Sequence, residues 1–141
     1  MGIRRATIED WQAIQSLLVQ LDYKGAAGLA SGKMERMLQD PDEVLLVYAG
    51  EGRILGFLSL HFIPQIALEG DFARISYFAV DEAARSKGVG RAMEEHCTEL
   101  ARERGCYLIE VHCHSRRLRA HDFYFRQGFS ESPKYLIKKL D

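Results

Sequence analysis

The sequence predicts an α+β fold, in which a mixed, mostly antiparallel sheet is flanked by helices. Three observations support this prediction. Apolar residues recur at helical spacing near the N-terminus, and two strand-like runs are then joined by the tight pair Glu51-Gly52, as in an antiparallel hairpin. Further on, a strand, a glycine-containing loop, a helix and another strand follow one another. A helical crossover of this kind joins parallel strands, so the sheet should contain one parallel pair.

Composition limits the classes of protein to which the chain can belong. With 141 residues, 47% of them hydrophobic and 28% charged, we expect one globular domain spanning residues 1–141. The formal net charge of −1 argues against nucleic acid as a partner. No apolar stretch approaches the roughly 20 residues that span a bilayer, so no membrane association is expected. The first residues show no secretory signal, and the three cysteines form no CxxC pair, which favours a cytoplasmic location.

The N-terminal quarter predicts two helices. Thr7 followed by Asp10 is typical of a helix start, and apolar residues at helical spacing follow: Ile8, Trp11, Ile14, Leu17, Leu18 and Leu21. Residues 22–31, which are rich in glycine and alanine, are expected to be mobile. A second, short helix is expected over GKMERMLQD, residues 32–40, and Pro41 ends it.

The rest of the chain predicts the sheet and two more helices. Strands are expected where β-branched and aromatic residues gather between turn residues. These strands are EVLLVYAG (43–50), RILGFLSLHFI (53–63), FARISYFAV (72–80), CYLIEVHCH (106–114) and KYLIKKL (134–140). Helices are expected at 89–104, with Gly105 as its C-terminal cap, and at 118–126, ending at Gly128.

The segment ARSKGVGR, residues 84–91, connects the strand ending at Val80 to the longest predicted helix. Gly88 and Gly90 carry no Cβ, so their amides can approach a ligand closely. These amides lie at a helix start, where N–H groups lack helical partners and the helix dipole is positive. The cations Arg85, Lys87 and Arg91 surround them. The segment therefore predicts an anion site, with phosphate as the expected ligand.

Two familiar phosphate-binding motifs do not fit this segment. A P-loop needs GxxxxGK[ST], which the sequence lacks. A Rossmann fingerprint needs glycine or alanine at the sixth position, where Met93 stands. Glu110 lies 20 residues after Gly90, as a ribose-binding acid would, but the antiparallel hairpin excludes a doubly wound sheet.

The loop resembles the pyrophosphate loop of the GCN5-related N-acetyltransferases, whose pattern is [RQ]xxGx[GA]. Arg85, Gly88 and Gly90 match this pattern. Downstream, AHDFYFRQGF (120–129) is similar to a second segment of that family, through Ala120, Tyr124, Gly128 and Phe129. The order of elements matches the family along essentially the whole chain. The resemblance implies an acyl-CoA N-acyltransferase fold, with the central parallel strands splayed around a CoA site.

The resemblance also implies which residues bind acetyl-CoA, the expected co-substrate. Backbone groups of the strand before the loop would hold the pantetheine arm, here Phe78, Ala79 and Val80. The loop would hold the pyrophosphate through Arg85, Ser86, Lys87, Gly88, Val89, Gly90 and Arg91. The expected reaction is direct attack of a primary amine on the thioester, through a tetrahedral intermediate. No metal is assigned.

The resemblance assigns one catalytic residue, and it leaves the second proton-transfer role open. Tyr124 matches the tyrosine that protonates the departing thiolate in the family. Many relatives carry a glutamate as base four residues before the final valine of the strand, where this chain has Ser76. A water chain, or an acid such as Glu69 or Asp71, would then take the proton of the amine. Arg117 replaces the asparagine that often contacts the pantetheine in relatives.

The acceptor is expected to be a small-molecule amine, and it could be anionic. The basic cluster SRRLR (115–119) suits either an anionic group of the acceptor or the 3′-phosphate of CoA. The histidine-containing strand end and the stretch around His121 resemble those of aminoalkylphosphonate N-acetyltransferases. His61, His112, His114 and His121 are an alternative set of metal ligands, although they lack a ligand-spacing motif.

Other functions remain open at this stage. The enzyme could acetylate a protein N-terminus or lysine, or the chain could be an acyl-CoA-binding sensor without chemistry. The serine and arginine at the two positions of departure favour the sensor. A homodimer is compatible with the family resemblance, but the sequence does not decide it.

Overall fold

A computed structural model describes residues 2–21, 23, 31–113, 117–132 and 135–140 of the chain. The predicted mobile segment 22–31 therefore falls largely outside the described residues, although Ser31 begins a helix. Five strands form one sheet in the order β1-β2-β3-β4-β5. They are β1 (Gly2–Arg5), β2 (Glu43–Gly50), β3 (Arg53–Ile63), β4 (Phe72–Val80) and β5 (Leu108–Val111). Only β4 and β5 are parallel, which confirms the predicted mixed sheet.

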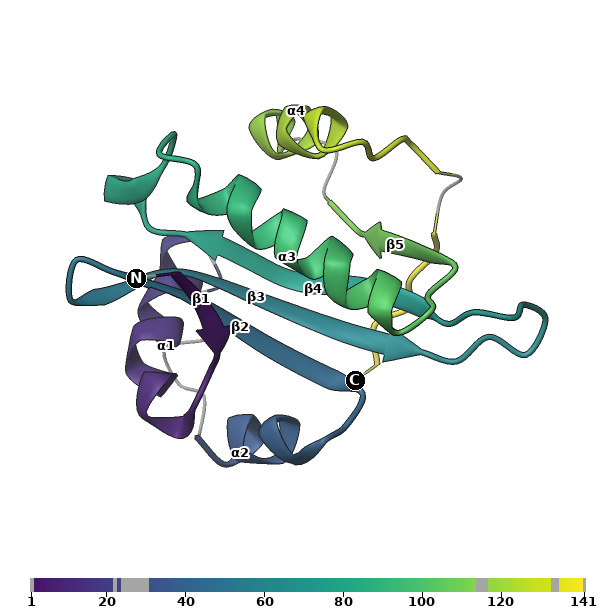
Figure 1. Cartoon of the computed structure of the whole chain (residues 1–141), viewed down its shortest axis with the longest axis horizontal. Coiled ribbons are helices and arrows are strands. Elements are labelled where there is room, and N and C mark those ends of the chain that lie inside the picture. Colours follow the sequence, from purple (N-terminus) through teal and green to yellow (C-terminus); the bar gives the residue numbers. More distant parts are fainter. Residues whose placement is uncertain (1, 22, 24–30, 114–116, 133–134, 141) are drawn as a thin grey trace.

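Helices cover both faces of this sheet. On one face, α1 (Trp11–Gln20) and α2 (Ser31–Gln39) bury Ile14, Leu17 and Met34 against β2, β3 and β4. On the other, α3 (Val89–Glu103) packs Met93 and Cys97 into a larger core. The helix α4 (Leu118–Arg126) follows β5. Figure 1 shows α1 and α2 on one side of the molecule and α3 and α4 on the other.

Local sequence explains where these elements begin and end. A short 3-10 turn (Ile8–Asp10) precedes α1, and the amide of Thr7 donates to the Asp10 carboxylate at 2.8 Å, as the predicted start requires. Glu51 and Gly52 both have positive φ angles, 56° and 74°, which the tight hairpin turn demands. Gly105, at φ 73°, comes two residues after Glu103, the last residue of α3, and adopts the left-handed conformation that often ends a helix.

A β-bulge in β4 determines the shape of the parallel pair. Across β3 and β4, Ser59 pairs with Tyr77 but the next residue, Leu60, pairs with Ile75. Ser76 is therefore the extra residue, and it bends the strand at that point. The ladder between β4 and β5 ends at the pair Ile75 and Val111, immediately before the bulge. Beyond the bulge, the segment 77–80 of β4 pairs with no strand on the β5 side among the described residues.

Three predicted elements differ from the structure. The predicted strand 106–114 forms only over Leu108–Val111, because β4 diverges from it at the bulge. The strand Gly2–Arg5, which pairs with β2, was not predicted. The predicted last strand at 134–140 was wrong, since residues 135–140 form no strand. In the described part of this segment the apolar side chains face solvent: Tyr135, Leu136, Ile137 and Leu140.

Candidate active site

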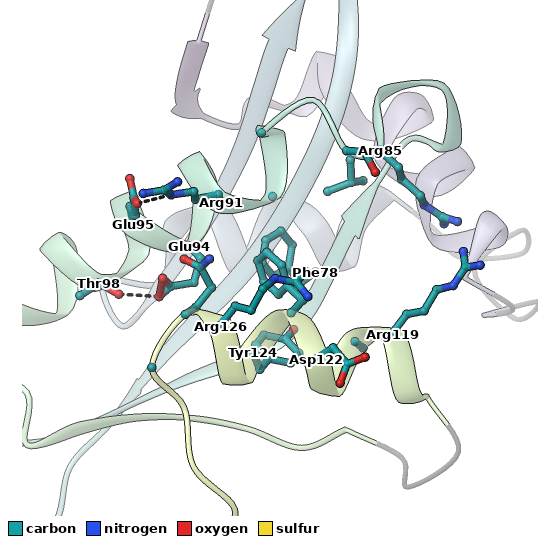
Figure 2. Close-up of a pocket in the computed structure, with 18 of the residues that line it drawn as sticks. Phe78, Arg85, Arg91, Glu94, Glu95, Thr98, Arg119, Asp122, Tyr124 and Arg126 are labelled. Atoms are coloured by element: carbon teal, nitrogen blue, oxygen red, sulfur yellow. Dashed lines mark hydrogen bonds and ion pairs between the residues drawn. The ribbon is translucent and has the colours of Figure 1, made fainter.

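A large cleft lies between α3, α4 and the free end of β4. Its volume is about 1600 Å³, above the several hundred Å³ that a drug-sized ligand occupies. The loop between β4 and α3 closes one end, and α4 forms the facing wall. Figure 2 shows Phe78 and Tyr124 in the middle of this space, with Arg85 and Arg119 extending on the same side of it. The cleft suits a long, anionic molecule.

The loop places unpaired amides next to cations. Gly88 adopts the left-handed conformation, at φ 84°, and so does Ser86, at φ 67°. Within the described residues, the amides of Ser86, Lys87 and Gly88 have no backbone acceptor. The first amides of α3 follow directly, at the positive end of a 15-residue helix. The geometry is that of an anion site.

The cations of the loop remain available to a ligand. Arg85 has no ion-pair partner among the residues that the structure describes. Arg91 pairs with Glu95 at 2.9 Å, but both side chains are more than half exposed, so the pair is weak and easily exchanged. Gly90 lies close to α4, since a Cβ there would stand 3.4 Å from the ring of Phe123. The first turn of α3 and the wall of α4 are thus in near contact.

The structure brings most of the predicted binding residues to the cleft. Those that line it are Phe78, Val80, Arg85, Ser86, Gly88, Gly90 and Arg91. Ala79 and Val89 do not line it, because Ala79 is buried in the core under α1 and Val89 in the core under α3. Lys87 is exposed and lies outside the lining. For Ala79 and Lys87 a contact with the ligand would have to come from the backbone or from a mobile side chain.

Tyr124 lies in an aromatic cluster on the wall of the cleft. Its ring centroid is 5.3 Å from those of Phe123 and Phe129, and 6.5 Å from that of Phe78. Burial raises the pKa of the Tyr124 phenol well above its usual value, and the nearby Cys113 raises it further. The phenol therefore keeps its proton at neutral pH. A neutral hydroxyl beside an apolar channel can donate a proton to a leaving group that departs as an anion.

The possible bases that the sequence suggested lie far from the bulge. Asp71 precedes β4 and is five residues from Ser76, roughly 16 Å along an extended strand. Glu69 lies further away along the chain, in the exposed loop before β4. Neither carboxylate is thus next to the point where β4 and β5 part.

Sequence reasoning missed several residues of the cleft. Glu94 is 4% exposed, lines the cleft and accepts a hydrogen bond from Thr98 Oγ1 at 2.7 Å. Nothing in the sequence singles out Glu94, since it belongs to no motif and an acid on an amphipathic helix normally faces solvent. Arg117 and Arg119 belong to the basic cluster 115–119, and both line the cleft. Ser115 and Arg116 of that cluster lie outside the described residues.

The histidines considered as metal ligands are held in other contacts. His61 Nδ1 lies 2.7 Å from Glu43 Oε1, and the ring of His112 stacks on Tyr135 at 4.2 Å between centroids. His121 lies beside Phe125 on α4. His114 falls outside the described residues. Within those residues, no group of three or more histidine, cysteine or acidic side chains could hold a metal ion. No described helix is long and apolar enough to cross a membrane.

Comparison with known proteins places this arrangement among acetyltransferases. The sequence profile of the "Acetyltransferase (GNAT) family" matches residues 8–129. An aminoalkylphosphonate N-acetyltransferase of Salmonella typhimurium is 27% identical over 98% of this chain and 90% of its own. A probable glucosamine 6-phosphate N-acetyltransferase of rice is 35% identical over 64% of this chain and 55% of its own. The crystal structure of a protein described as a transcriptional regulator, from Bacillus halodurans, superposes with a TM-score of 0.87 at 26% identity and 98% coverage of both chains.

Proposed function

Because the chain belongs to the GNAT family of acetyltransferases, we propose that it transfers the acetyl group of acetyl-CoA to the primary amine of a small molecule. One observation carries the proposal. A single cleft joins the unpaired amides and cations of the loop to Phe78 and Tyr124. An elongated molecule with phosphates at one end and a reactive thioester at the other matches this layout.

The parts of acetyl-CoA correspond to different parts of the cleft. The pyrophosphate would accept hydrogen bonds from the amides of residues 86–91, with Arg85 and Arg91 neutralising its charge. The pantetheine amides would pair with the backbone of Phe78–Val80, which β5 leaves free beyond the bulge. Arg119, on the wall formed by α4, extends on the same side of the cleft as Arg85, where it suits a further phosphate of the coenzyme.

Tyr124 would act at the end of the reaction. A neutral amine attacks the thioester carbonyl, the nitrogen of the tetrahedral intermediate gives up a proton to water, and the bond between carbon and sulfur then breaks. The thiolate that leaves takes a proton from the buried phenol, and the phenolate regains one from solvent before the next turnover. The raised pKa of Tyr124 ensures that the phenol is protonated when the thiolate forms.

The acceptor proposed is a small amine with an acidic group. The two curated relatives are named for an aminoalkylphosphonate and for glucosamine 6-phosphate, each an amine with a phosphorus oxyanion. Their sequences are 27% and 35% identical to this chain over the matched regions.

The test is a screen of amines with acetyl-CoA in which released thiol is followed. Small amino acids, aminophosphonates, amino sugars, aminoglycosides and peptides with free N-termini or lysines form the panel. Turnover of a small amine supports the proposal. Turnover of peptides alone would assign the enzyme to protein acetylation. Tight CoA binding with no turnover of any amine would make the chain a sensor.

A further inference from the structure

We infer that a row of four charged residues across the sheet binds the acceptor amine, with Arg74 and His61 holding its acidic group and Glu110 its ammonium group. This inference rests on the proposed function and identifies the acceptor site. The row consists of Glu43 on β2, His61 on β3, Arg74 on β4 and Glu110 on β5. Each residue is directly opposite the next in the strand register.

The row lies on the face of the sheet opposite the cleft. Side chains alternate between the faces of a strand. Leu45, two residues from Glu43, belongs to the core under α1 and α2. Val44, Leu60, Phe62 and Ala73, which lie next to members of the row, belong to the core under α3. The charged row therefore faces the α1 and α2 side, beyond the apolar residues that those helices cover.

The charges of the row are paired incompletely. Arg74 Nε and Nη2 both contact a single oxygen of Glu110, Oε1, at 2.6 and 2.5 Å. Within the described residues, Arg74 Nη1 and Glu110 Oε2 have no partner. At the other end, Glu43 Oε2 is buried and has no hydrogen-bond partner there. Burial raises the pKa of the Glu43 carboxyl, an effect that the charge of His61 partly offsets.

A buried hydroxyl borders the row. Ser59 lies two residues from His61 on the same face, is 2% exposed, and its Oγ has no partner in the described structure. A buried hydroxyl without a partner costs free energy, so such groups often mark a place where a ligand or water binds. Opposite it stands Tyr77, whose ring meets that of Tyr23 at 5.0 Å. Ser59, Tyr77 and Tyr23 therefore place hydroxyl groups and aromatic rings beside the charged row.

One end of the row lies next to the point where β4 and β5 diverge and their pairing ends. The pair Arg74 and Glu110 is one register step from Ile75 and Val111, the last pair before β4 and β5 part. A thioester that enters between the diverging strands from the α3 and α4 side would emerge next to this pair. His61 and Arg74 are 36% and 40% exposed, so a solute can reach them. An amine held by Glu110 would be close to the acetyl group.

The charge pattern selects the chemical class of the acceptor. Arg74 and the imidazole of His61 stand in the middle of the row, and a carboxyl group stands at each end. A molecule with an acidic group and an ammonium group a few bonds apart can satisfy Arg74 and the second oxygen of Glu110 together. A plain alkylamine can satisfy only the carboxylate. The row should therefore favour amines that carry an acidic group.

The experiment compares acceptors in matched pairs. The pairs are 2-aminoethylphosphonate with propylamine, and glucosamine 6-phosphate with glucosamine. In the wild type we expect the acidic member of at least one pair to have a kcat/KM at least tenfold above that of its neutral partner. Arg74→Met should raise KM for that acidic acceptor roughly tenfold to a hundredfold. KM for acetyl-CoA should stay within about twofold, and kcat/KM for the neutral amine should change by clearly less than that for the acidic acceptor.

Arg4→Met is the control variant. Arg4 makes a comparable pair with Asp10 at 2.8 Å, on an edge strand of the same sheet and away from the row. It should leave all acceptor constants unchanged. If no acidic acceptor is preferred, the inference and the proposed acidic acceptor are both wrong, while transfer of the acetyl group to a small amine stands. If Arg74→Met weakens acidic and neutral acceptors equally, only the inference is wrong.

A binding measurement separates failure of the row from failure of the enzyme. If no amine releases thiol, the proposed function fails. Calorimetry with 2-aminoethylphosphonate and the CoA-loaded protein then tests whether the row binds the acceptor. If the wild type and Arg4→Met bind 2-aminoethylphosphonate and Arg74→Met does not, the result supports the row as the acceptor site. If the wild type does not bind it, the inference is wrong.

Discussion

Tyr124 is the residue on which the proposed chemistry depends most directly. It lines the cleft, and aromatic rings surround it on several sides. Tyr124→Phe removes one oxygen and leaves this packing in place. We expect kcat to fall on the order of a hundredfold, as for loss of a general acid, while the affinity for acetyl-CoA stays within about twofold. Tyr107→Phe, at an exposed tyrosine that stacks on Phe72, is the control and should keep full activity.

The pH dependence of kcat provides an independent check on the same residue. The pKa of Tyr124 is raised, so its protonated form persists to higher pH than that of an ordinary phenol, whose pKa is about 10. The proton donor is therefore present throughout the range from pH 7 to 10. We expect the wild type to show no alkaline loss of kcat in this range from Tyr124. An alkaline limb below pH 10 that disappears in Tyr124→Phe would show that the pKa of Tyr124 is not raised, while still identifying Tyr124 as the proton donor.

Asp10 is a single residue with a structural role that can be measured. It accepts hydrogen bonds from both terminal nitrogens of Arg4, at 2.8 and 2.9 Å, and from the amide of Thr7. Arg4 is the main reason why the pKa of Asp10 is lowered. A lowered pKa means that this stabilisation is complete above the unfolded-state pKa of about 3.9 and is lost as the pH falls through the folded-state value.

Asp10→Asn should therefore lower the free energy of unfolding by about 1 to 2 kcal/mol at pH 7. The difference between wild type and variant should shrink below about pH 4, as the wild-type carboxyl becomes neutral. Urea denaturation at pH 7 and pH 3 measures both quantities. Glu9→Gln changes an acid in the same turn and should alter stability by less than about 0.5 kcal/mol. An equal loss at both pH values would rule out the ionic explanation.

The loop before α3 and the hairpin turn before β3 share one feature, which allows a matched test. Gly88 and Gly52 have positive φ angles, 84° and 74°, and a Cβ at either position would meet no atom within 4 Å. Alanine at each position should cost about 1 kcal/mol of stability through backbone strain alone. Only Gly88→Ala disturbs amides that would bind the pyrophosphate.

We thus expect Gly88→Ala to weaken acetyl-CoA binding at least tenfold, and Gly52→Ala to leave it unchanged. Calorimetry gives the affinities, and denaturant unfolding confirms that both variants lose similar stability. If Gly88→Ala binds acetyl-CoA as the wild type does, the amides of this loop do not hold the coenzyme.

The elements differ in how well the sequence predicted them. The bounds of β2, β3 and β4 agree with the apolar runs, because each run lies between turn residues and is buried by both cores. The segment 135–140 is similarly rich in residues that favour strands, but it has no strand partner among the described residues. Composition alone therefore gave a wrong prediction of a strand there. The bulge at Ser76 has no local signal, since it depends on how β3 and β4 register with each other.

The candidate site was predictable only where it consists of local sequence. Gly88, Arg85 and Tyr124 belong to short motifs, and the structure brings all three to one cleft. Glu94 and Arg74 carry no motif. Arg74 lies in the charged row because it pairs with His61, 13 positions earlier, and with Glu110, 36 positions later. Only the folded sheet brings these residues together. The family resemblance did not identify these residues, because it rests on matched motif positions.

The described part of the molecule offers two opposed surfaces, and its three cysteines are poor nucleophiles. Figure 1 shows α1 and α2 on one side of the sheet and α3 and α4 on the other. The cleft lies on the side of α3 and α4, and strand alternation places the charged row on the side of α1 and α2. Burial raises the pKa of Cys97 to about 12, and it raises the pKa values of Cys106 and Cys113 as well. Thiolates are therefore scarce at neutral pH, and these cysteines are unsuited to carry an acetyl group.

Transfer should then require both substrates on the protein at the same time. Initial rates measured over a grid of acetyl-CoA and acceptor concentrations should give intersecting double-reciprocal lines, as expected for a ternary complex. The variant in which Cys113, the cysteine nearest in sequence to α4, is replaced by alanine should give the same pattern with kcat within about threefold. Parallel lines, together with an acetylated protein isolated in the absence of acceptor, would instead show a covalent intermediate. Such a result would remove the need for the two faces to be occupied together, and with it the reason to place the acceptor opposite the cleft.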